Sequence, residues 1–427
     1  MKTYLRPLAV VVAGAVVLSG CGRGEAAGPM PTELEGSGAR VVVTDAPARD
    51  DVVTATWQLG IAAARTGDGT AVVSPSSLVT ALAMLGEGAV GDESAPFDAA
   101  LGAAGQDRTD AVNVLQSALA RYDGDPAVVQ ADTLPTTPVL HTAQRIVVDD
   151  DVAAAPAFLD RLQRGYGAGV LTVDLASDAG LAALSAWVDQ HTGGLVKQTG
   201  IKPDESTLAV LQDALVLAAA WQQPFDPDHT HEADFSLPSG AGTVAVPTMH
   251  AELDVPLVVT DQWTAVRLPY ADGLTADLML PSRCDPSERC PEVDNPALAD
   301  AAVVQALSER LDSAPATTVE VALPTLDLAT RTDLMGLLTD LGIAGHRLTG
   351  VRVDGEPVVV SQAVQQTVLK IDEDGTRAAA VTEIAMTDGA AAPREVPEVR
   401  FDRPFILVVR DSTTGWPVLL ASVLDPR

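Results

Sequence analysis

The chain has 427 residues, and its 58 acidic and 27 basic side chains give a formal net charge of -31. A protein this acidic repels phosphate backbones, so we expect no nucleic-acid partner. The length suits one large domain or two ordinary ones.

The first twenty residues are typical of an export signal. Lys2 and Arg6 precede an apolar run at residues 8–18, which is too short to span a bilayer as a helix of the folded protein. Leu-Ser-Gly-Cys follows at 18–21 and resembles the lipobox of bacterial lipoproteins, in which the cysteine becomes the lipidated N-terminus. The alternative is an ordinary signal peptide with an incidental cysteine. We therefore expect an exported protein, held at the membrane surface by a lipid on Cys21 or secreted.

Residues 21–45 are rich in Gly, Ala, Pro and Glu and show little periodicity, which is typical of a flexible tether. Regular patterns begin near Asp50 and continue to the C-terminus without a second linker or an internal repeat. We therefore expect residues 46–427 to form one domain, and we expect a monomer.

Apolar residues at helical spacing predict three helices. These cover residues 77–85 with Ser76 or Ser77 as N-cap, 181–188 ending near Gly193 and Gly194, and 334–341 ending at Gly342. Segments rich in β-branched residues predict strands at 318–323, 351–360, 364–371, 406–409 and 418–424. Helices dominate the first half and strands the second, so the sequence predicts an α+β fold with large antiparallel sheets.

Cys284 and Cys290 lie close together, with Pro286 between them. In an exported protein such a pair indicates a disulfide that closes a small loop. A metal site is the alternative, but no histidine lies near these cysteines in the sequence.

Several segments resemble, in the same order, sequences of the serpin family of protease inhibitors. They are residues 74–85 (SPSSLVTALAML), 187–197 (WVDQHTGGLVK), 221–226 (WQQPFD), 266–270 (VRLPY), 278–281 (LMLP), 319–328 (VEVALPTLDL), 341–343 (LGI), 401–405 (FDRPF) and 423–426 (VLDP). The resemblance covers about residues 48–427. It implies the serpin fold, with about nine helices around three β-sheets and an exposed reactive-centre loop at about 373–400.

Residues 372–383 (DEDGTRAAAVTE) resemble the hinge of inhibitory serpins. Alternate residues from Thr376 to Met386 are small or apolar, whereas the residues between them include acidic and basic side chains. This alternation predicts a strand with one buried face. Gly375 would serve as a pivot that tolerates unusual φ. A permanent strand is the alternative to a loop that inserts after cleavage. The predicted hinge residues are Glu373, Gly375, Thr376, Ala378, Ala379, Ala380 and Thr382.

The resemblance implies a suicide-substrate inhibitor of serine, possibly cysteine, endopeptidases and no enzymatic activity. The protease would form an acyl-enzyme with the loop, which then enters the main sheet and traps it. Counting from Glu373 as in the family gives Gly389–Ala390 as the cleaved bond and favours an elastase- or subtilisin-like target. Counting back from Pro404 gives Pro393–Arg394, where Arg394 suits a trypsin-like protease. Met386 is a third candidate. A non-inhibitory serpin that acts as a cell-surface binding or carrier protein is the alternative function.

The family's polar cluster beneath the main sheet is present in altered form. Ser74 and Ser77 stand at its serine positions, Asp213 replaces an asparagine and Gln365 replaces a histidine. Trp221 is retained where the loop enters the sheet. Thr325 replaces a basic residue that often pairs with the hinge glutamate, which would leave Glu373 without that partner.

An enzyme is the competing class of protein. His229, His231 and His250 could bind zinc, but exposed histidines in a polar loop are the simpler interpretation. The sequence contains no Gly-x-Ser-x-Gly, His-Glu-x-x-His or P-loop motif. We therefore expect no metal and no cofactor.

Overall fold

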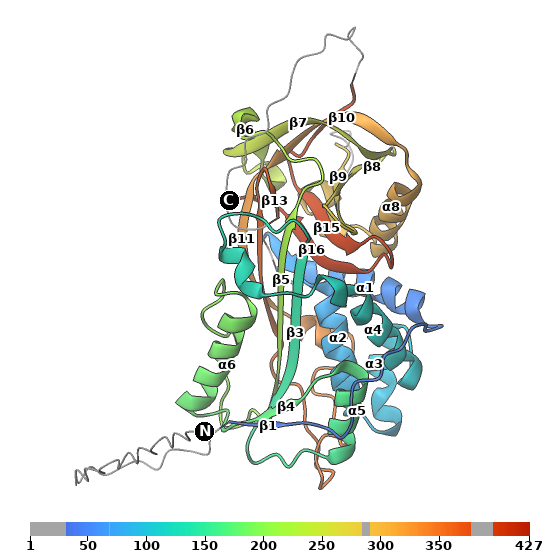
Figure 1. Ribbon diagram of the computed structural model, residues 1–427, viewed down its shortest axis with the longest axis vertical. Helices are drawn as coiled ribbons and strands as arrows, with labels where there is room; N and C mark the ends of the chain where they lie inside the picture. The colour runs from blue at the N-terminus through green and yellow to red at the C-terminus, as the bar shows by residue number, and fades with distance from the viewer. Residues whose placement is uncertain (1–30, 68, 284–290, 377–395) are drawn as a thin grey trace, which may run out of the picture.

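The computed structural model describes residues 31–67, 69–283, 291–376 and 396–427 (Figure 1). The described strands form a seven-stranded and a nine-stranded sheet. The described part of the chain contains nine α-helices, so the predicted α+β fold is confirmed. The helices are α1 (Arg49–Ala64), α2 (Pro75–Gly86), α3 (Ala95–Leu101), α4 (Gly105–Leu119), α5 (Pro156–Tyr166), α6 (Asp178–His191), α7 (Pro291–Asp294), α8 (Ala301–Ser313) and α9 (Met335–Asp340).

The seven-stranded sheet lies between α6 on one side and α2 on the other (Figure 1). In spatial order its strands are β1 (Thr32–Leu34), β4 (Val170–Thr172), β3 (Val139–Val148), β5 (Ala209–Ala220), β13 (Gly375–Thr376), β12 (Val364–Ile371) and β11 (Leu326–Asp333). Because β13 comes from a late part of the chain, the sheet joins segments that are far apart in the sequence.

The nine-stranded sheet bends along its longest strand. Its order is β14 (Glu398–Arg400), β10 (Ala316–Pro324), β7 (Thr243–Val259), β8 (Trp263–Pro269), β9 (Leu274–Pro281), β15 (Phe405–Asp411), β16 (Pro417–Val423) and β2 (Ala71–Val73), with β6 (Thr230–Ser236) paired to β7. One part of β7 pairs with β10 and the next with β8. Two of the three expected sheets are therefore joined through β7.

Helix α2 lies in the core against both sheets, and all of its residues are buried. A helix that is apolar on every side needs such a position. Its N-cap is Ser74, whose hydroxyl accepts a hydrogen bond from the amide of Ser77, and Pro75 occupies the first turn. The prediction of Ser76 or Ser77 as the N-cap was therefore wrong by two or three residues.

Helix α6 ends as the sequence predicts. Gly193 and Gly194 follow it with φ of 58° and 83°, values that favour glycine. A Cβ on Gly193 would also lie 2.1 Å from the carbonyl oxygen of Pro126. These glycines let the chain turn away from α6 beneath the 3-10 turn at Pro126–Gln130.

The predicted strand at 351–360 is wrong. The chain turns at Gly355, whose φ is 71°, and Arg352 pairs with Asp354 across the turn. Pro357 has no amide hydrogen to give to a ladder. Val351 and Val358 are nevertheless buried, so their apolar character reflects two anchor points of a loop.

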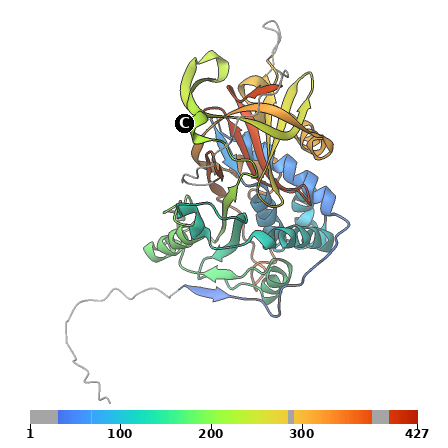
Figure 2. The same ribbon diagram turned by 45° about the horizontal axis from the view of Figure 1, so that its top comes forward.

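The described part of the predicted tether, residues 31–45, contacts the domain at several points. β1 pairs with β4 at the edge of the sheet (Figure 2). Farther along, the buried side chain of Asn113 on α4 donates to the carbonyl of Val41 and accepts from the amide of Val43.

Several predicted residues lie outside the described ranges, namely Cys21, Cys284 and Cys290. Among the described residues, no helix is both long enough and apolar enough to cross a membrane.

We predict that Asn113→Ala releases the segment that contains Val41 and Val43. The substitution removes the side-chain partner of the buried Gly165 carbonyl, which costs about 1–3 kcal/mol, and the partners of the partly exposed Val41 and Val43 groups. Hydrogen exchange should show loss of protection at the Val43 amide, together with a lower melting temperature. Gln106→Ala, on the exposed face of the same helix, is the matched control. Unchanged protection at Val43 would show that the segment is held by other contacts.

Candidate functional site

The site lies at the head of the seven-stranded sheet, where β13 separates β5 from β12 (Figure 1). Gly375 and Thr376 pair with Ala220 and Ala219 of β5, and Thr376 also pairs with Ile371 of β12. Both pairings are antiparallel, so β5 and β12 run parallel to each other. Among the described residues no ladder joins β5 directly to β12.

The described start of the expected exposed loop is therefore buried in the sheet. Thr376 is only 2% exposed. A Cβ on Gly375 would lie 2.1 Å from the carbonyl oxygen of Ala219. Glycine is required here because of this close approach of the backbone, and its role as a pivot stays a prediction.

Two stacked aromatic rings hold this segment in place. Trp221, which follows β5, stacks on Tyr270 with ring centroids 4.5 Å apart. The indole of Trp221 donates to the carbonyl of Asp372 at 3.1 Å, and its amide donates to the carbonyl of Asp374 at 2.8 Å. The hydroxyl of Tyr270 lies 2.5 Å from that of Thr376. The aromatic pair thus contacts the chain on both sides of Gly375.

Glu373 has partners although the family's basic residue is absent. The hydroxyl of Thr230 donates to its carboxylate at 2.5 Å, and the amide of Phe225 donates to its backbone carbonyl at 2.9 Å. Thr230, Phe225 and Tyr270 were not identified as site residues from the sequence. Phe225 and Tyr270 do lie in the motifs WQQPFD and VRLPY, which were the available signals.

A small cavity of about 20 Å³ opens beyond Thr376. Residues Leu215–Leu217 of β5 line one side and Val368–Lys370 of β12 line the other. The cavity therefore lies between β5 and β12, next to Thr376.

Farther down the sheet, a polar bridge spans β5 and β12. The amide nitrogen of the Gln365 side chain donates to the carboxylate of Asp213 at 3.3 Å and to the carbonyl of Ser74 at 3.1 Å. The backbone amide of Ser74 donates to the Gln365 side-chain oxygen at 2.7 Å. Gln144 on β3 also donates to Asp213 at 3.0 Å. The structure thus brings Ser74, Asp213 and Gln365 together at the start of α2, next to Ser77.

The carboxyl group of Asp213 is desolvated by burial. Burial raises its pKa to about 6, and the hydrogen bonds from Gln144 and Gln365 offset part of this effect. An asparagine at this position would carry no charge at any pH. The substitution of aspartate for the family's asparagine therefore makes the cluster sensitive to pH.

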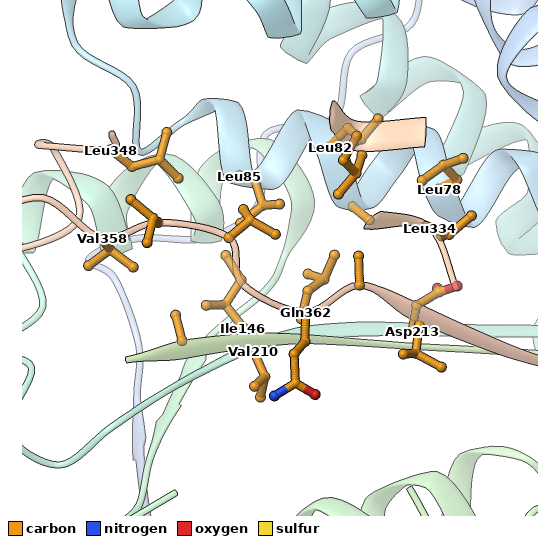
Figure 3. A pocket seen from close by; sticks show the side chains of 18 of the residues that line it. Leu78, Leu82, Leu85, Ile146, Val210, Asp213, Leu334, Leu348, Val358 and Gln362 are labelled. Carbon is orange, nitrogen blue, oxygen red and sulfur yellow. The ribbon is translucent and has the colours of Figure 1, made fainter. Parts of the chain in front are cut away.

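A larger apolar cavity, of about 60 Å³, lies beside the polar bridge, between α2 and the lower part of the sheet (Figure 3). Leu78, Leu82 and Leu85 of α2 point into it from one side, and Ile146 and Val210 of the sheet line the other. Side chains of the loop at 348–363 close its third side, including Leu348 and Val358.

The remaining predicted site residues lie outside the described ranges. They are Ala378, Ala379, Ala380 and Thr382 of the hinge and the reactive-bond candidates Met386, Gly389, Ala390, Pro393 and Arg394. The histidines of the zinc alternative are described. His231 and His250 stack with centroids 4.2 Å apart, but the described residues contain no group of three or more possible ligands that could hold a metal.

We predict that Asp213→Asn changes how stability depends on pH. Because the native pKa of Asp213 is raised, the native state binds this proton more tightly than the unfolded chain does between about pH 4 and pH 6. Stability from this group therefore falls as pH rises through that window, by on the order of 3 kcal/mol. The Asp213→Asn variant has no such pH-dependent loss. The difference between its melting temperature and that of the unaltered protein should therefore grow in favour of the variant from pH 4 to pH 6. Asp51→Asn, at an exposed carboxylate, is the control and should show no such trend. A melting-temperature difference for Asp213→Asn that stays the same from pH 4 to pH 6 would contradict the prediction.

Comparison with known proteins agrees with this architecture. Among solved structures, the thermophilic serpin tengpin in its native state superimposes with a TM-score of 0.74 at 20% identity, covering 93% of this chain and all of that one. Thyroxine-binding globulin in complex with thyroxine gives 0.69 at 22% identity, covering 89% of this chain and 99% of the other. These structures share the fold.

Sequence relatives support the same assignment. Mouse alpha-1-antitrypsin 1-1 is 28% identical over 364 residues, covering 83% of this chain and 82% of the relative. Horse alpha-1-antiproteinase 2 is 27% identical over 363 residues, covering 83% of this chain and 80% of the relative. Residues 58–426 match the family described as Serpin (serine protease inhibitor). The chain therefore belongs to the serpin family.

Proposed function

We propose that this protein inhibits serine endopeptidases, possibly also cysteine endopeptidases, as a suicide substrate. A protease that attacks the loop forms an acyl-enzyme, and insertion of the hinge then removes the ester from productive geometry. The observation that carries the proposal is the position of β13, the first two residues of the hinge, between β5 and β12.

The register of β13 supports insertion of the following residues. Each step forward from Thr376 corresponds to one step back along β5 and along β12, because both pairings are antiparallel. Six steps beyond Thr376, this register brings Thr382 opposite Asp213 on one side and Gln365 on the other. An inserting hinge would therefore separate the Asp213–Gln365 bridge and place a hydroxyl between its two halves.

The side-chain pattern of the hinge sequence also supports insertion. Residues directly opposite in a ladder share a face, so the small and apolar set that includes Thr376 would point toward α2. In the same register an inserted Ile384 would lie opposite Leu211 and Ala363, which line the larger cavity. An inserted strand would gain a ladder on each side, which supplies free energy from backbone groups that need partners.

We also propose that the chain is exported and held at a membrane surface by a lipid on Cys21, as its N-terminal pattern indicates. β1, the first described strand, lies at one end of the molecule, whereas β10 and its partner β14 lie at the other (Figure 1). Since β14 follows the loop in sequence, an anchor at Cys21 would leave the loop directed away from the membrane. The disulfide between Cys284 and Cys290 stays a prediction.

We predict that one of four proteases, elastase-, subtilisin-, trypsin- or chymotrypsin-like, forms a complex that survives denaturation. The released C-terminal peptide should begin at Ala390 for an elastase- or subtilisin-like enzyme, since Gly389–Ala390 is the favoured bond. The cleaved protein should melt at a higher temperature than the intact one, because insertion completes the sheet. If every protease cleaves the loop and stays active, with no gain in melting temperature, the non-inhibitory carrier function is favoured instead.

We predict that Thr376→Arg converts the protein from an inhibitor into a substrate. Thr376 is buried between two strands, and a guanidinium group there would lose its hydration without gaining a charged partner. The fraction of protease trapped should fall by about tenfold or more, a difference of about 1.4 kcal/mol between the two outcomes, while the loop is still cut. Thr243→Arg, at an exposed residue of β7, should trap protease as the unaltered chain does. Equal trapping by Thr376→Arg would exclude insertion at this position.

A further inference from the structure

A cavity of about 420 Å³ lies away from the hinge, where the N-terminal segment meets α4, β3, α6 and the turn after α5. Its volume falls within the about 300–1,000 Å³ of small-molecule sites in proteins. Unlike the cavity in Figure 3, it has mostly polar walls, to which Gln116, Thr142 and Gln144 contribute.

Two guanidinium groups line this cavity without an ion pair. Arg145 donates to the side-chain oxygen of Gln212 at 2.7 Å and to the carbonyl of Ala183 at 3.1 Å. Arg40 donates to the side-chain oxygen of Gln116 at 3.1 Å, and its Nε is buried without a hydrogen-bond partner among the described residues. All of these acceptors are neutral. The described residues place no carboxylate within ion-pair distance of either arginine.

This arrangement is unusual in a protein whose 58 acidic residues outnumber its 27 basic ones and offer many possible ion-pair partners. Burial lowers the pKa of Arg40, and it lowers that of Arg145 to about 10, although Glu33 raises the latter in part. Both groups still carry their charge at neutral pH, and a desolvated charge without a counter-ion is unfavourable. An anion in the cavity would supply the missing compensation.

Two carboxylates, those of Glu33 and Asp123, also line the cavity, but among the described residues neither forms an ion pair with Arg40 or Arg145. Glu33 is exposed, and Asp123 lies 2.8 Å from Nδ1 of His141. The other nitrogen of His141 lies 2.9 Å from His191. Burial, aided by His141 and Arg145, lowers the pKa of His191 to about 4, so this imidazole is neutral at pH 7.

The aromatic rings of Trp187 and His191 lie next to Arg145 in this cavity. The guanidinium of Arg145 lies 5.0 Å from the centroid of the Trp187 ring, and the His191 ring lies 4.5 Å from Trp187 on the same helix. A planar group could pack here while its negative charge reaches the arginines. Charge-assisted hydrogen bonds between arginine and carboxylate are among the stronger ones in proteins.

We propose that this cavity binds a small organic anion, a carboxylate on a planar ring, with Arg40 and Arg145 supplying the positive charge and Trp187 packing against the ring. The site lies away from the hinge, but it adjoins the polar bridge, because Gln144 lines the cavity and also donates to Asp213.

Isothermal titration of the full chain with 2-naphthoate and with its neutral analogue 2-naphthamide tests this proposal. The acid should bind about tenfold or more tightly than the amide, and its affinity should fall as salt is added. Similar affinities for the two probes, or no binding of naphthoate at millimolar concentration, would overturn the proposal. This comparison needs no variant, so it holds even if a substitution impairs folding.

Arg40→Gln and Arg145→Gln should each weaken naphthoate binding by about tenfold or more. Arg347→Gln, which removes the same charge from an exposed loop outside the cavity, is the matched control. Melting temperatures would identify any variant that fails to fold. If the folded arginine variants bind naphthoate as the control does, the assignment of Arg40 and Arg145 is wrong.

Discussion

The structure depends on a constraint between β5 and β12. These parallel strands face each other in the middle of the large sheet, and in the described part of the chain only Gly375 and Thr376 pair with β5 from the side of β12. Backbone groups inside a protein need hydrogen-bond partners. A sheet with such a gap can therefore gain free energy by accepting another strand, and the same sequence supplies one immediately after Thr376.

Two sets of contacts around the gap between β5 and β12 would resist the insertion of a strand. At the head, the Trp221–Tyr270 pair and Thr230 hold the first residues of the hinge. In the middle, the bridge from Asp213 to Gln365 crosses the gap and ties both strands to Ser74 at the start of α2. A native state that is kinetically trapped needs barriers of this kind. Because the bridge contains a carboxyl group with a raised pKa, its strength depends on pH as well as on packing.

Replacement of the family's residues changes the chemistry of the site while the architecture stays the same. Thr325 removes a basic partner for Glu373, and the structure supplies Thr230 from a different strand. Gln365 can donate and accept at once, so it joins Ser74 and Asp213 as a single side chain. The residue types at these positions indicate that the polar groups can still bond, but nothing local in the sequence relates Thr230 to Glu373.

The sequence by itself determined the fold class and the ends of α6 and α9, because periodicity and glycine positions are local properties. It overestimated the strand at 351–360, since two buried valines flank a turn that Gly355 makes possible. Only the tertiary structure decided that Gly375 and Thr376 lie inside the sheet, that β1 is bound at its edge, and that Arg40 and Arg145 share one cavity. Each of these depends on which distant segments pack together, and burial and charge compensation at those contacts are set by three-dimensional neighbours that spacing along the chain does not reveal.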